Sequence, residues 1–212
     1  MFISAQCYEE LYLDGKDEKA ILAEVEKIRR EIAKLKQKME SPSYRAQIHP
    51  YPSEGDTVAK YREYLWRALD KLSETSEGES RLTPEEERSR AFNARIDRIA
   101  ALTFNQGRYL QYKHELSFED GTAYLKTFHL DSEPTVKEVS EEKMKLGIEK
   151  LYLGEWKSSY SYDNYGFAVN DATRWHLRVE YYGREAPVFF DGVGIFPYNF
   201  DDLLRLLEAE MI

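Results

Sequence analysis

The sequence predicts an α+β protein, in which an N-terminal antiparallel helical hairpin of the coiled-coil type precedes a mostly antiparallel sheet with packed helices. Apolar residues recur at helical spacing up to residue 73, and they alternate with a period of two after residue 98. A polar stretch, SETSEGES, lies between the two patterns. We therefore expect an N-terminal helical arm over 1–76 and an α+β domain over 83–212.

The first helix is predicted from a heptad seam between residues 17 and 39. Its apolar positions alternate in spacings of four and three, and they are Ile21, Val25, Ile28, Ile32, Leu35 and Met39. Ser41-Pro42 ends the helix, because a residue before proline leaves the α region. The seam can pair with another helix of the same chain, with a second copy as a homodimer, or with the main body, and the sequence leaves these three open.

A second helix is expected from about Thr57 to Ser73, after a connector rich in proline over 42–56. Two amphipathic helices joined by a loop favour an antiparallel hairpin. The first helix also carries six basic residues and one acidic residue between Lys27 and Lys38, a local charge of +5. This run is interpreted either as a solvated helix face or as a patch for nucleic acid or an acidic protein.

The sequence predicts strands and short helices in the second half of the chain. Thr83, Pro84 and Glu86 form the start of a helix that runs to about Arg95, as N-cap, N1 and N3. Residues 173–182 alternate strictly between an apolar and a polar side. Further strands are expected at 99–104, 109–118, 122–130 and 186–192, with an Asp120-Gly121 turn, and further helices at 141–152 and 199–210.

Composition excludes several classes of function. The net charge is −9, which argues against general nucleic-acid binding and fits either solubility or a basic partner. Cys7 is the sole cysteine, so no intrachain disulfide and no thiolate metal cage can form. The N-terminus has no signal-peptide pattern and no stretch is apolar enough to span a membrane, so a cytoplasmic protein without membrane contact is expected.

The sequence contains no recognisable catalytic motif, so we predict no catalytic residue, no metal site and no cofactor. The histidines lack the spacing of a helical zinc motif; they are His49, His114, His129 and His176. Two alternatives stay open. One is a hydrolase that uses a pair of the carboxylates expected at turns, which are Glu155, Asp163, Asp171 and Asp191. The other is a domain that binds a small ligand or nucleotide in a pocket lined by Tyr181 and Phe189.

The C-terminal half resembles a family of hypothetical proteins, many of them carried by mobile elements of gut anaerobes. The resemblance rests on LYLGEWKSSY, YGFAVNDATRWHLRVEYYG and FDGVGIFPYNFDDLLRLL, which form a Gly-Glu-Trp segment, a strand with tryptophan and a Pro-x-Asn-Phe segment before the last helix. The chain departs from the pattern at 170–173, where Asp-Gly-Thr is usual, and at 195–197, where Ala-Tyr-Pro is usual. The resemblance implies a genomic neighbourhood and no mechanism.

The stretch GEWKSSYSYDNYGF, residues 154–167, is interpreted as a recognition loop, since aromatic rings among small polar residues are typical of binding loops. Trp156 is expected in the core, Tyr160 and Tyr162 at the surface. The predicted partner-binding residues are Tyr160, Tyr162, Asp163 and Tyr165. We thus expect a non-enzymatic protein that binds another protein. The narrowest hypothesis, which follows from the mobile-element resemblance, is an anti-CRISPR-like inhibitor that blocks an RNA-guided nuclease.

Overall fold

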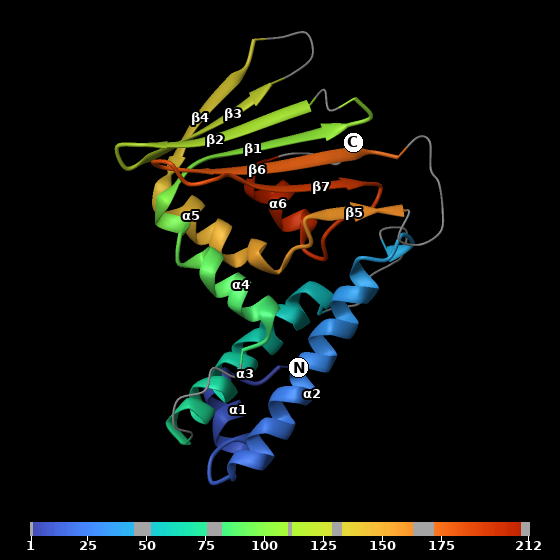
Figure 1. The fold of residues 1–212 in the computed structure, drawn as a ribbon, viewed down its shortest axis with the longest axis vertical. Helices are drawn as coiled ribbons and strands as arrows, with labels where there is room; N and C mark the ends of the chain where they lie inside the picture. The colour runs from blue at the N-terminus through green and yellow to red at the C-terminus, as the bar shows by residue number, and fades with distance from the viewer. Residues whose placement is uncertain are drawn as a thin grey trace. The chain divides into compact units, whose positions relative to one another are not determined.

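The computed structural model describes residues 2–44, 52–75, 82–109, 112–128, 133–162 and 172–208, and it confirms the predicted α+β class (Figure 1). The chain divides into two compact units, Met1–Arg81 and Leu82–Ile212. The first unit is helical and the second contains the sheet. Within the described residues, no helix combines the length and the apolar character needed to cross a membrane.

The described part of the first unit contains the α-helices α1 (Ala5–Tyr12), α2 (Glu18–Met39) and α3 (Glu54–Thr75). Ser4 and Asp17 cap α1 and α2, because their side chains accept hydrogen bonds from the first-turn amides. The sequence interpretation missed α1. The only buried side chain of this helix is Tyr8, so no apolar stripe marks it in the sequence.

The heptad seam is buried inside this unit. Helices α2 and α3 pack antiparallel, as the hairpin prediction required. The buried seam positions of α2 are Ile21, Val25, Ile28 and Ile32, whereas Leu35 and Met39 are half-buried. They pack with the buried aliphatic positions of α3, which are Val58, Leu65, Ala68, Leu69 and Leu72. Of the three pairings left open, the structure thus contains the one within the chain, and a homodimer through this seam would have to displace α3.

Stacked tyrosine rings pack α1 against the hairpin of α2 and α3. The ring of Tyr8 lies between those of Tyr12 and Tyr64, with centroids at 5.0 and 4.1 Å. Its hydroxyl donates to a carboxylate oxygen of Glu24 at 2.6 Å. Burial, together with this bond and the negative charge of Glu24, raises the pKa of the Tyr8 phenol far above its usual value. Tyr8 therefore acts as a neutral hydrogen-bond donor in the core of the arm.

The second unit is built on a seven-stranded sheet in the order β4-β3-β2-β1-β6-β7-β5. All neighbouring strands are antiparallel except β5 and β7, which run parallel. The strands are β1 (Ile99–Gly107), β2 (Tyr112–Glu119), β3 (Thr122–Phe128), β4 (Thr135–Ser140), β5 (Ser159–Ser161), β6 (Arg174–Tyr181) and β7 (Val188–Val193).

The hairpin turn and two unpredicted strands complete the sheet. Asp120 and Gly121 both have positive φ, at 49° and 81°, which confirms the predicted turn between β2 and β3. The short strands β4 and β5 were not predicted. No side chain of β4 is fully buried, so this edge strand lacks the apolar alternation by which strands are found in a sequence.

One face of the sheet forms the core. Helices α5 (Glu141–Lys150) and α6 (Phe200–Leu206) belong to this side, where the Phe200 ring packs on Phe104 and Trp175 at centroid distances of 5.8 and 5.1 Å. A bulge in β1 between Ile99 and Ala101 changes the alternation there. It explains why Ile99 is buried along with Leu102 and Phe104.

The residues of the Gly-Glu-Trp pattern belong to this core. Trp156 is buried, as predicted, and its Nε1 donates to Oδ1 of Asn199 at 2.9 Å. The amide nitrogen of Asn199 donates in turn to the carbonyl of Leu151 at 2.7 Å. A Cβ on Gly154 would lie 2.5 Å from the backbone oxygen of Arg88 in α4 (Pro84–Asn93). The pattern that carries the resemblance therefore holds the core together.

Candidate binding face of the sheet

The second face of the sheet is built from side chains that are exposed or half-buried, and we call it the open face. The strand register places its residues side by side across the six antiparallel strands. They are Ala101, Thr103, Asn105, Lys113, Glu115, Ser117, Glu119, Thr122, Tyr124, Lys126, Phe128, Val136, Glu138, Arg174, His176, Arg178, Glu180, Phe189, Asp191 and Val193. None of them is buried, whereas most of their neighbours on the core side of β1, β2, β3, β6 and β7 are.

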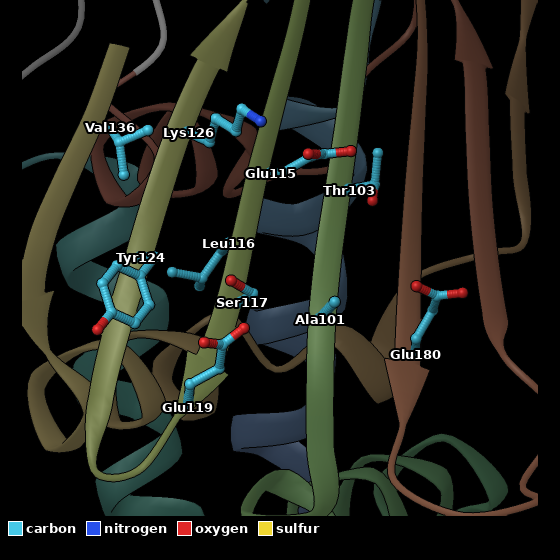
Figure 2. A pocket seen from close by; sticks show the side chains of 10 residues that line it. All are labelled: Ala101, Thr103, Glu115, Leu116, Ser117, Glu119, Tyr124, Lys126, Val136 and Glu180. Atoms are coloured by element: carbon cyan, nitrogen blue, oxygen red, sulfur yellow. The ribbon is translucent and has the colours of Figure 1, made fainter. Parts of the chain in front are cut away.

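A hollow of about 390 Å³ lies on this face (Figure 2). Its middle is formed by the short side chains of Ala101, Thr103 and Ser117, on β1 and β2. Longer side chains stand on both flanks: Tyr124, Lys126 and Val136 on β3 and β4, and Glu180 on β6. The hollow therefore arises because the residues that the central strands present in its middle, on the open face, are small, whereas the residues that alternate with them, such as Leu102 and Leu116, are bulky and fill the core side.

The hollow carries more negative than positive charge. Glu115, Glu119, Glu180 and Lys126 line it. Glu115 is paired with Lys113, and Glu180 with Arg178 at 2.5 Å. Within the part of the chain that the structure describes, Glu119 has no ion-pair partner. A carboxylate at the rim of a concave surface is thus available to a cationic group of another molecule.

Exposed apolar side chains surround the hollow. Val136 is 60% exposed and Phe189 is 57% exposed. The guanidinium of Arg178 lies 5.5 Å from the centre of the Phe189 ring, a cation–π contact that holds the two side chains together. Tyr182, which follows β6, is half exposed and donates its hydroxyl to the backbone oxygen of Phe118. Rings fixed in this way offer contact area at a small cost in conformational entropy.

One residue of the predicted recognition loop is buried and not exposed. Tyr160 is 2% exposed, so the expectation that it lies at the surface is wrong. It packs against Trp175 at 5.8 Å, and its hydroxyl accepts a hydrogen bond from the amide of Lys157. Tyr162 is half-buried. Asp163 and Tyr165 lie outside the described residues. Tyr160 was misjudged because it sits in β5, whose pairing with β7 no local pattern in the sequence reveals.

The ligand pocket expected between Tyr181 and Phe189 is not formed by these two residues. Tyr181 continues the buried row of β6, whereas Phe189 pairs with Arg178 on the open face. The two side chains therefore lie on opposite faces of the sheet. Strict alternation made the direction of each side chain along 173–182 predictable, but it did not relate one strand to the next.

The basic run of α2 is partly neutralised within its own unit. Lys27 pairs with Glu24 and Arg29 with Glu26, each one turn away. Lys38 pairs with the buried carboxylate of Glu54 at 2.5 Å. Lys27, Arg29 and Lys38 thus have carboxylate partners, which favours the interpretation as a solvated helix face over that of a nucleic-acid patch.

Three of the residues considered for catalysis or metal binding are engaged in structural contacts. His114 is buried, and its Nδ1 lies 3.2 Å from the hydroxyl of Thr127. Asp191 accepts a hydrogen bond from Ser159, and Glu155 lies within 3.4 Å of the Tyr198 hydroxyl. Asp163 and Asp171, like His49 and His129, lie outside the described residues. Among the residues described, no group of three or more His, Cys, Asp or Glu side chains is arranged to hold a metal ion.

No family model, no curated protein and no solved structure matches the chain in the three comparisons with known proteins.

Proposed function

We propose that the protein is a non-enzymatic binding module, and that the open face of its sheet contacts a protein partner. One observation carries the proposal: the sheet is buried on one face, while the other face combines a hollow with exposed apolar side chains. Exposed apolar groups such as Phe189 and Val136, with charged residues around them, are typical of protein interaction sites. Side chains on a rigid sheet also need little ordering on binding.

The charge of the hollow points to a basic partner surface. Three carboxylates and one ammonium line it, and Glu119 is available for pairing. The whole chain carries a net charge of −9, so it repels phosphate groups at long range and attracts cationic proteins. A partner that places a Lys or Arg side chain near Glu119 gains both association rate and specificity.

A narrower form of the proposal is an inhibitor of a nucleic-acid-handling enzyme, such as an anti-CRISPR-like protein that blocks an RNA-guided nuclease. The channel that binds nucleic acid in such an enzyme is basic, and a chain with a net charge of −9 is complementary to it. This form is supported by charge complementarity and by the resemblance to proteins of mobile elements. An interference assay with purified nuclease complexes tests it: the protein is expected to abolish target binding at a stoichiometric ratio. Undiminished target binding at a large excess would reject this narrower form.

A quantitative pull-down tests the electrostatic part of the proposal. Tagged wild-type protein and the Glu119→Lys variant are incubated with lysate at two salt concentrations, and retained proteins are measured by mass spectrometry. We expect the variant to retain about tenfold less of the partner at low salt, and the difference to shrink at high salt. Glu142→Lys is the matched control, because it changes the net charge equally at an exposed position of α5. Equal losses for both variants would show that net charge, and not the open face, governs binding.

A further inference from the structure

The outer strand β4 presents a free backbone edge, and we propose that this edge is a docking site for an extended segment of the partner protein. The segment would pair with β4 as an additional strand and place a basic side chain opposite Glu138. The inference rests on the proposed function and deepens it, because it states which conformation and which charge the partner segment has. It also extends the same surface, since Val136 of β4 lines the hollow.

The edge is regular, and no strand among the described residues pairs with its outer side. β4 stands at one end of the strand order, and within the described ranges its partner is β3. Its register with β3 runs from Thr122–Ser140 to Thr127–Thr135 without a shift. Five of its six residues are exposed, and the strand contains neither proline nor glycine. In an antiparallel strand, alternate residues point their N–H and C=O groups away from the paired neighbour, so β4 offers a row of donors and acceptors.

The usual protection of an edge strand is weak here. Proteins commonly block such edges with a bulge, a proline or a lysine that resists pairing. β4 has one lysine, Lys137, and its ammonium is held by the carboxylate of Glu208. The neutralised lysine opposes an incoming strand less than a free one would. The edge therefore remains competent to accept a strand, which is the arrangement used in β-augmentation.

A second copy of the chain is disfavoured at this edge in the registers that centre on a charged residue. Two β4 strands related by a two-fold axis must pair residue by residue about one self-opposed position, because only residues of the same sheet face can stand opposite each other. Centring on Lys137 opposes two lysines, and centring on Glu138 opposes two glutamates. Like charges directly opposite each other destabilise a strand pair. These two registers are therefore disfavoured, whereas a register centred on Val136 opposes two valines and no like charges, so pairing with a second copy is an outcome of the test below. The carboxylate of Glu138 favours a partner strand that carries a basic residue.

The open-face residues of β4 define which side chains the partner strand carries. Val136 is 60% exposed and lies beside Lys126, while Glu138 lies beside Tyr124. An antiparallel partner strand therefore needs a basic residue opposite Glu138 and, two residues later, an apolar one opposite Val136. The occupant is an extended basic segment with this alternation.

Peptide titration followed by NMR tests the inference on the full chain. The probe is the blocked hexapeptide Thr-Lys-Thr-Val-Thr-Thr. We expect the amide signals of residues 135–140 to shift on its addition, with an affinity about fivefold higher than that of the same peptide with Glu in place of Lys. In the Glu138→Lys variant the order of the two peptides should reverse. A peptide with the same side chains but N-methylated throughout should not shift β4, because it cannot donate backbone hydrogen bonds.

Three results would overturn the inference. They are equal shifts with the N-methylated peptide, no shift of β4 with any peptide, and a concentration-dependent dimer in sedimentation that Glu138→Lys dissociates. None of these results bears on the open face itself, which is tested by the Glu119→Lys pull-down. If the protein keeps its Glu119-dependent partner but does not bind the peptides, the proposed function stands and the edge site is rejected.

Discussion

At the scale of single residues, a few buried polar groups and glycines decide whether the sheet unit can form. Asn199 joins three segments, because its amide bonds both the Trp156 indole and the Leu151 carbonyl. Gly192 lies against the indole of the fully buried Trp175. Neither role involves the open face. Both residues therefore allow the stability of the core to be tested separately from binding.

Asn199→Ala should destabilise the sheet unit by about 2–4 kcal/mol, because it leaves a buried indole N–H and a buried carbonyl without partners. Chemical denaturation followed by tryptophan fluorescence measures this change. Asn105→Ala is the matched control, since Asn105 stands on the open face and should change stability by less than about 0.5 kcal/mol. Equal effects of the two variants would contradict the bridging role of Asn199.

Gly192→Ala should also destabilise the sheet unit, by about 1–3 kcal/mol, through a direct clash. An added Cβ would lie 2.4 Å from Nε1 of Trp175, which has no room to move in a filled core. Gly55→Ala provides the contrast: its Cβ would meet only ordinary contacts at 3.7 Å. The melting temperature should fall for the first variant and stay level or rise for the second. A Gly192→Ala protein with unchanged melting would show that the core around Trp175 is loosely packed.

At the scale of elements, the arm depends on the pairing of α2 with α3. Val25→Asp should unfold the arm and leave the sheet unit folded, because it buries a charge without a partner at a position that is 0% exposed. Hydrogen exchange read by mass spectrometry separates the two units. Ala33→Asp introduces the same charge at an exposed position of α2 and should leave exchange unchanged. If Val25→Asp instead converted a stable dimer into a folded monomer, the seam would be an interface between copies.

Acid should weaken the arm through Glu54. Burial alone would raise the pKa of this carboxyl, but hydrogen bonds from Lys38, from its own backbone and from Tyr44 outweigh burial and lower it from 4.5. Because this carboxyl has a lower pKa in the folded state than in the unfolded state, its ionised form stabilises the fold at pH values above the unfolded-state pKa. This stabilisation is lost as the pH falls through the folded-state pKa. The stability difference between wild type and Glu54→Gln should therefore shrink below about pH 4.5. Glu63→Gln removes an equal charge from an exposed position of α3 and is the control.

Elements with a strong local signal were predictable, and elements that depend on pairing were not. The heptad seam indicated α2, and the Thr83 capping box indicated α4; the structure confirms both. The Asp120-Gly121 dipeptide likewise fixed the β2–β3 turn. In contrast, β4 and β5 are defined by their neighbours, to which no local pattern points. The burial of Tyr160 could not be predicted for the same reason.

At the scale of the whole molecule, the candidate site emerged from the sheet order and not from a motif. The polar side of residues 173–182 was visible in the sequence, yet the open face needs six strands in register to exist. The hollow forms only where Ala101 and Ser117 come side by side on β1 and β2. A binding surface of this kind is formed by segments that are distant in the sequence, and no local pattern indicates it. The sequence therefore favoured a continuous loop as the binding site.

The most direct test of the open-face site is site-specific photo-crosslinking in cells. A photoreactive phenylalanine analogue replaces Phe189 or Tyr182 at the open face, and Leu146 of α5 as an exposed control. Each protein is purified under denaturing conditions, and its cross-linked products are identified by mass spectrometry. We predict one protein partner cross-linked from Phe189 and Tyr182 and not from Leu146. A partner captured only from Leu146, or equally from all three positions, would contradict the assignment of the open face as the binding site.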